Sequence, residues 1–209
     1  MMNMGIIIYY LIVIILILTR TYNKERMSVF VKTVLSIILI SVAILSSSNE
    51  KWILIAIMFS AITDIFLAIY KIEKKSYLFY IAVILVTCSQ LCLLVSSKYL
   101  AGFNYYSIFC AILINFGLYI IFSKIGKMKL MQKLSMIYSF IFLILVSNVI
   151  INIKYLNGIY VISIILYWIS DVVLYLQKFI ITKHKKMLDG INKVLYYTAQ
   201  LLMIIYILK

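Results

Sequence analysis

Proline is absent from this chain of 209 residues, so its helices lack the usual cause of a sharp kink. Acidic residues are also scarce, with 6 Asp and Glu against 20 Lys and Arg. The single histidine, His184, lies among lysines, where we expect it to be solvated. Cys88 and Cys92 share a helix face inside an apolar segment without other ligands nearby, which indicates packing. We therefore predict no metal site and no cofactor.

Apolar residues, in contrast, are abundant. They make up 66% of the sequence, charged residues 12%, and the mean hydropathy is +1.14, more than a soluble fold of this length can bury. Apolar segments long enough to cross about 30 Å of hydrocarbon as helices recur without the alternation of barrel strands. We predict an all-α polytopic integral membrane protein, one eight-helix membrane domain over residues 1–209. The expected spans are about 4–20, 29–47, 52–70, 77–96, 105–123, 131–151, 158–177 and 193–208.

The net charge of +14 is unevenly distributed between the connections. Sixteen of the 20 basic residues lie after the first, third, fifth and seventh spans or early in the next span. Because basic connections stay in the cytoplasm, we predict a multi-pass protein of the cell (cytoplasmic) membrane with both termini outside. The basic clusters then contact lipid headgroups, and no nucleic-acid partner is expected. We interpret Asp189-Gly190, in the connection 178–192, as a break before the last span.

Two aspartates, Asp64 and Asp171, are the only acids inside long apolar runs, where a carboxylate is costly and calls for a functional reason. Their surroundings match, since Thr63-Asp64-Ile65-Phe66-Leu67 is similar to Ser170-Asp171-Val172-Val173-Leu174. Each is followed seven positions later by a lysine, in spans that we expect to run in the same direction. The spacing predicts that both carboxylates lie at one depth and could meet, and it suggests a 4+4 arrangement of parallel repeats.

Helical spacing identifies the neighbours of these acids. Small residues such as Ser60 and Ala61 share the face of Asp64, which indicates that it points into the bundle. Around Asp171 the same spacing gives Tyr167, Trp168, Leu174 and Tyr175, which could wall an apolar ligand or lie at an interface. Lys32 is either a counter-ion to an aspartate or a lysine that snorkels to the headgroups. The predicted site has Asp64 and Asp171 as catalytic residues and Lys32, Ser60, Tyr138, Ser170, Tyr197 and Gln200 as substrate-binding residues.

Two carboxyl groups at one depth can share a proton and so supply both an acid and a base. Such a pair suits acid-catalysed cleavage of a bond that passes through an oxocarbenium-like cation. Because the pair lies inside a bilayer near the headgroups, we expect a lipid substrate.

The ordered motifs resemble the YhhN-like family of lysoplasmalogenases over nearly the full length. They are Lys32-Thr33, Phe59-Ser60-Ala61-Ile62-Thr63-Asp64-Ile65-Phe66-Leu67, Tyr138, Ser170-Asp171-Val172-Val173-Leu174 with Phe179, and Tyr196-Tyr197-Thr198-Ala199-Gln200-Leu201-Leu202. The resemblance implies an eight-span hydrolase that cleaves the vinyl-ether bond of lysoplasmalogens to a fatty aldehyde and a glycerophospho-base, with the two aspartates as catalytic residues. The chain departs from the family pattern at Thr33, Thr63 and Gln90, which usually correspond to proline, glycine and histidine.

Two alternatives from other classes stay open. A proton-coupled transporter of lipids or small molecules would also need intramembrane acids in repeated halves, although no discontinuous helix is indicated here. A catalytically inactive membrane protein could pair its aspartates with Lys32 for structural reasons.

Overall fold

The computed structural model describes residues 25–45, 50–125, 130–179 and 185–208, with the isolated positions 12 and 15. Within these ranges the chain forms seven α-helices and one short 3-10 helix. They are α2 (Glu25–Leu45), α3 (Lys51–Glu73), α4 (Ser76–Ala101), α5 (Tyr106–Ile125), α6 (Leu130–Ile151), η1 (Ile153–Tyr155), α7 (Gly158–Phe179) and α8 (Lys185–Ile207). The predicted all-α fold is confirmed. His184 lies outside the described residues. So does the predicted span at 4–20, except for Ile12 and Ile15.

Four of these helices are long and apolar enough to cross a membrane. The four apolar segments are Lys51–Tyr70, Ser76–Ala101, Lys133–Ile151 and Gly158–Gln177. Shorter apolar segments, Val29–Ser41 and Tyr106–Ile120, lie in α2 and α5. The chain therefore has the helices of a membrane protein, while the count of eight spans and the 4+4 repeat stay predictions.

Helix α8 corrects one prediction. A break was expected at Asp189-Gly190, whereas α8 begins at Lys185 and continues through both residues to Ile207. Gly190 costs a helix interior only about 1 kcal/mol relative to alanine. The packing of α8 along α7 opposes that cost, because tertiary contacts on one face stabilise helices more than intrinsic propensity does. Asp189 and Lys193 consequently lie on the same continuous helix as Tyr197.

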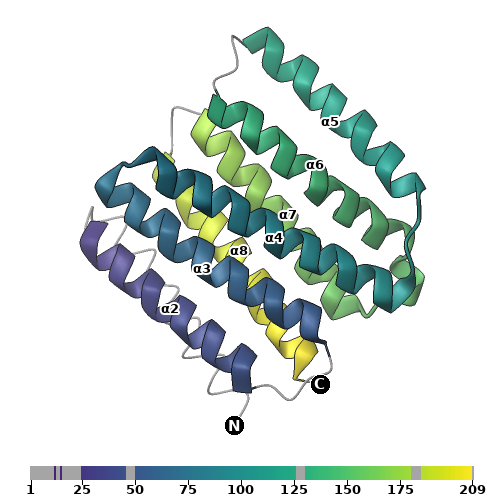
Figure 1. Ribbon diagram of the computed structural model, residues 1–209, viewed down its shortest axis with the longest axis horizontal. Helices are drawn as coiled ribbons and strands as arrows, with labels where there is room; N and C mark the ends of the chain where they lie inside the picture. Colours follow the sequence, from purple (N-terminus) through teal and green to yellow (C-terminus); the bar gives the residue numbers. More distant parts are fainter. Residues whose placement is uncertain are drawn as a thin grey trace.

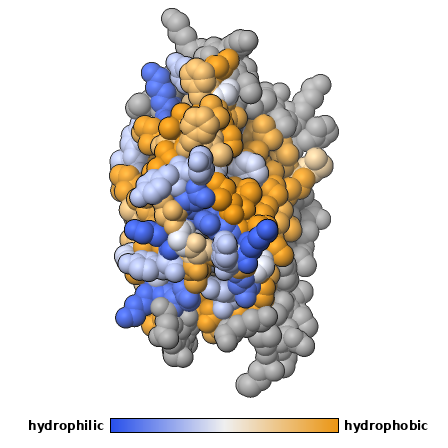
Figure 2. All heavy atoms as spheres, turned by 90° about the vertical axis from the view of Figure 1, so that its right-hand side faces the viewer, coloured by the Kyte–Doolittle hydropathy of each residue, from blue (hydrophilic) through white to orange (hydrophobic). Residues whose placement is uncertain are grey.

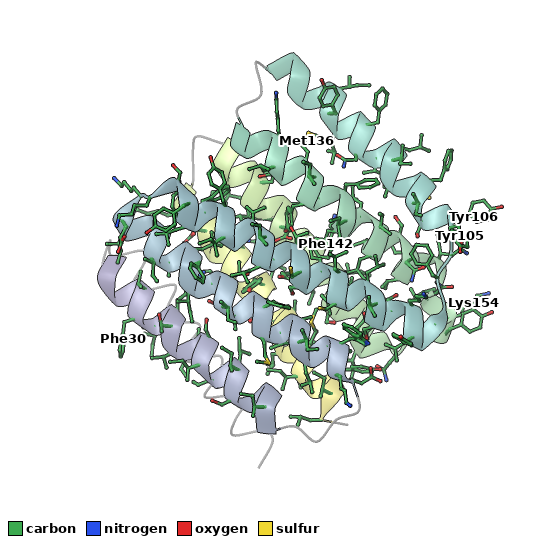
Figure 3. All side chains as sticks on the ribbon, viewed as in Figure 1. Phe30, Tyr105, Tyr106, Met136, Phe142 and Lys154 are labelled. Carbon is green, nitrogen blue, oxygen red and sulfur yellow. The ribbon has the colours of Figure 1, made fainter. Side chains whose placement is uncertain are left out.

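The helices run alongside one another as a bundle (Figure 1). Helix α3 packs along α4 and α7 along α8, and further contacts join α4 to α6, α6 to α7, and α3 to α8. Helices α2 and α5 lie at opposite edges, where α2 packs on α3 and α5 on α6. Figure 3 shows the contrast between interior and edge, since Phe142 of α6 lies inside the bundle and Phe30 of α2 points away from it.

Asparagines of α5 and α6 connect neighbouring elements. The Asn148 amide donates to Ser97 Oγ (2.8 Å) and to the Gly102 carbonyl (3.3 Å), and its Oδ1 accepts from the backbone N–H of Asn104 (2.9 Å). Asn115 Nδ2 donates to a backbone carbonyl of α6 at 3.2 Å. Figure 2 looks onto the end of the bundle with the α4–α5 connection, where hydrophilic residues gather between hydrophobic flanks.

Candidate active site

A cavity of about 430 Å³ lies among the helices, and both predicted catalytic aspartates line it. Asp64 is nine residues before the end of α3 and Asp171 is eight before the end of α7. At 1.5 Å per residue the two carboxylates are therefore about 12–14 Å from the ends of their helices. The two similar sequence motifs thus contribute to one cavity from two different helices.

Asp64 is buried, with 4% of its surface exposed. Its Oδ1 lies 2.5 Å from Lys32 Nζ on α2, and its Oδ2 accepts a hydrogen bond from Tyr197 Oη of α8 at 3.5 Å. The sequence left two interpretations of Lys32 open. In the structure it is the counter-ion of Asp64 and does not extend toward the headgroups. The Lys32 ammonium therefore supplies a counter-charge to this buried carboxyl group.

Asp171 has different surroundings. It is only partly buried, and its Oδ2 accepts a hydrogen bond from the phenol of Tyr138 on α6. Tyr138 is one helical turn from the buried Phe142, whose ring packs edge-on against Tyr167 of α7 at a centroid distance of 5.3 Å. The aromatic residues fix α6 against α7 and so position the phenol. Tyr167, Leu174 and Tyr175, which share the face of Asp171, line the cavity, whereas Trp168 packs against the core.

The remaining predicted site residues fall into two groups. Ser170 lines the cavity, and its Oγ and carbonyl accept hydrogen bonds from Asn192 Nδ2 at 2.9 and 2.7 Å, which fastens α7 to α8. Ser60 and Gln200 are buried but do not line the cavity. Gln200 Nε2 donates to Ser60 Oγ at 2.9 Å, so this pair joins α8 to α3 beside the wall that carries Asp64 and Tyr197.

Sequence reasoning missed a second ion pair in the cavity. Lys193 Nζ lies 2.8 Å from Asp189 Oδ2, and both side chains line the cavity. The predicted break at Asp189-Gly190 hid this pair, and Lys193 was counted among the residues that contact headgroups. The four-residue spacing of opposite charges is a helix signal that would have revealed it.

Apolar side chains complete the lining. Helix α4 contributes most of them, and α3 and α7 supply one leucine each. These residues are Leu67, Phe79, Ala82, Val83, Val86 and Leu174. One cavity therefore combines charged groups with an apolar wall, and it can hold a molecule that has both a polar and an aliphatic part.

Residues 27–206 match the model of the YhhN family. The chain belongs to the YhhN family. The predicted resemblance is thereby confirmed over most of the chain, and the matched range includes every residue of the predicted site in this YhhN protein. No curated protein and no solved structure matched the chain.

Proposed function

We propose that this YhhN protein is a membrane hydrolase that cleaves the vinyl-ether bond of lysoplasmalogen-type lipids. The observation that carries the proposal is the cavity itself, in which Asp64 and Asp171 share the lining with an apolar wall. Two carboxyl groups provide the acid and the base that ether hydrolysis needs, and the apolar wall suits an aliphatic chain. Family membership supports the same activity class, because the family includes hydrolases.

The unequal partners of the aspartates suggest a division of roles. Asp64 beside the Lys32 ammonium is the ionised group, and Asp171 beside the Tyr138 phenol is the acid. Asp171 would protonate the vinyl carbon and leave an oxocarbenium ion, whose charge the Asp64 carboxylate stabilises. Asp64 would then take a proton from water as its oxygen adds to the cation and forms a hemiacetal.

Collapse of the hemiacetal returns both aspartates to their starting states. Asp171 takes the proton of the hemiacetal hydroxyl as the aldehyde forms, and Asp64 gives its proton to the departing glycerol oxygen. The net reaction consumes one water and yields a fatty aldehyde and a glycerophospho-base. Neither step needs a group beyond the two carboxyls and water, which is why we assign the reaction to the aspartates.

The proposal includes the membrane orientation. Lys32 and Lys193 form ion pairs in the cavity, so neither is a plain topogenic charge. The excess of basic residues in the odd connections persists without these two. We therefore retain a cell-membrane protein with both termini outside and the aspartates in the half of the bundle nearer the cytoplasm.

The test is release of fatty aldehyde from an alkenyl lysophospholipid by the purified protein in detergent. We expect turnover by the wild type, and a loss of about 10²–10⁴-fold in Asp64→Asn and in Asp171→Asn, the range for removing a general acid or base. Glu73→Gln, a substitution of an exposed acid at the end of α3, serves as the matched control and should retain full activity. Undiminished aldehyde release by the folded double asparagine variant would exclude the mechanism.

A further inference from the structure

The ion pair between Asp189 and Lys193 has no part in the proposed reaction, yet it lines the same cavity. Both residues are more than nine-tenths buried, at 7% and 5% exposure. A buried ion pair loses hydration that its attraction does not always repay, and apolar residues of similar size would stabilise the helix equally well or better. The pair therefore calls for a reason other than the stability of α8.

The register of α8 orders the charges along the cavity. Asp189, Lys193 and Tyr197 follow one another at four-residue intervals on one helix face, about 6 Å apart per step. Tyr197 contacts Asp64, so it marks the level of the proposed catalytic carboxylate. Moving from there toward the start of α8, the cavity wall presents first a cation, Lys193, and then an anion, Asp189.

We propose that Asp189 and Lys193 are the headgroup-binding residues of this cavity and that they select a zwitterionic headgroup. The inference rests on the proposed function for the position of the scissile bond at Asp64. A phosphate one step away would meet the Lys193 ammonium, and a terminal ammonium would meet the Asp189 carboxylate. A ligand that carries both charges in this order can take the place of each partner without leaving a buried charge uncompensated. An anionic or neutral headgroup cannot replace both partners of the ion pair.

The experiment measures binding with lipids that the proposed reaction cannot cleave. Saturated alkyl ethers lack the double bond that is protonated, so affinity is read independently of turnover. The probes are alkyl-ether lysophosphatidylethanolamine, alkyl-ether lysophosphatidic acid and the uncharged alkylglycerol, all with one chain length. We expect the purified wild type to bind the zwitterion most tightly, lysophosphatidic acid about tenfold more weakly and alkylglycerol about a hundredfold more weakly, since each charged hydrogen bond that a probe lacks costs about tenfold.

The variants separate the two charges. Lys193→Gln should lose the advantage of both phosphate-containing probes over alkylglycerol, and Asp189→Asn should lose only the preference for the zwitterion over lysophosphatidic acid. The exchange of the two residues, Asp189→Lys with Lys193→Asp, keeps an ion pair in the helix but reverses its order, and it should abolish the preference. An exchanged variant that folds and still prefers the zwitterion would overturn the inference.

A matched control comes from the exposed pair Glu73–Lys75, which lies outside the cavity with its charges 2.9 Å apart. The hydrogen bond to Glu73 raises the pKa of Lys75. Glu73→Gln with Lys75→Gln should leave all three affinities unchanged. Zwitterion preference without any aldehyde release would sink the proposed hydrolysis alone, whereas aldehyde release with an unchanged preference in the exchanged variant would sink the headgroup assignment alone.

Discussion

The α3 side and the α7 side of the cavity each supply one aspartate in nearly the same local sequence, but the two carboxyl groups have unlike partners. Asp64 is buried against an ammonium, and Asp171 is partly exposed and contacts a phenol. The ammonium comes from α2, a helix at the edge of the bundle, and the phenol comes from α6. The difference teaches that a repeated motif need not have repeated surroundings, because helices distant in sequence supply the partner of each carboxyl group.

The packing of α2 explains why the ammonium is there. Val31, Leu35 and Leu39 form the buried face of this helix against α3, and Lys32 follows Val31 at the rim of that face. Burial of the apolar face therefore sets the rotation of α2 and directs the Lys32 side chain toward Asp64. Helix α5, at the opposite edge, packs on α6, and none of its described side chains lines the cavity.

Among substitutions of the residues that contact the two aspartates, Lys32→Gln should cause the largest loss of aldehyde release. It leaves a buried carboxylate without its counter-charge, and truncating one member of such a pair costs about 2–5 kcal/mol. We expect aldehyde release to fall by about 30-fold or more, with partial retention in Lys32→Arg. The measurement is the rate of aldehyde formation in detergent. Lys51→Gln, which removes an exposed lysine at the start of α3, is the control and should be neutral.

Tyr138→Phe should cause a smaller loss of aldehyde release, because a neutral hydrogen bond stabilises a carboxyl group less than an ammonium does. The loss corresponds to about 1–1.5 kcal/mol, or roughly tenfold in rate. Tyr119→Phe on the exposed face of α5 is the matched control. Equal losses in Lys32→Gln and Tyr138→Phe would break the comparison, since they would mean that the two acids are equivalent.

The sequence predicted much of this site because its strongest signals are chemical. Asp64 and Asp171 stood out as acids in apolar runs, and helical spacing together with the family motifs selected Lys32, Tyr138 and Tyr197, all of which line the cavity. The choice between the two interpretations of Lys32 depended on the rotation of α2. That rotation is set by packing against a helix distant in sequence, so a local pattern could not supply it.

The predicted break before the last helix was wrong for a related reason. Asp189-Gly190 has the local chemistry of a turn, and tertiary packing along α7 overrides it. With Asp189 assigned to the connection and Lys193 to the start of the last span, their joint position in the cavity could not be predicted. The side chains of Ser60 and Gln200 bond to each other outside the lining, so their assignment as substrate-binding residues stays a prediction.

Ser60→Ala should have the smallest effect on turnover and sharpens the comparison on the Asp64 side. The substitution removes the acceptor of the Gln200 amide, a contact between α3 and α8. Hydrogen bonds between membrane helices contribute about 0.6 kcal/mol on average, so we expect a modest drop in thermal stability and a rate within about threefold of the wild type. Ser41→Ala, at an exposed position of α2, controls for the change of side chain. If Ser60→Ala instead raised KM strongly at unchanged stability, Ser60 would contact the substrate, and the wall beside Asp64 would have to open during the reaction.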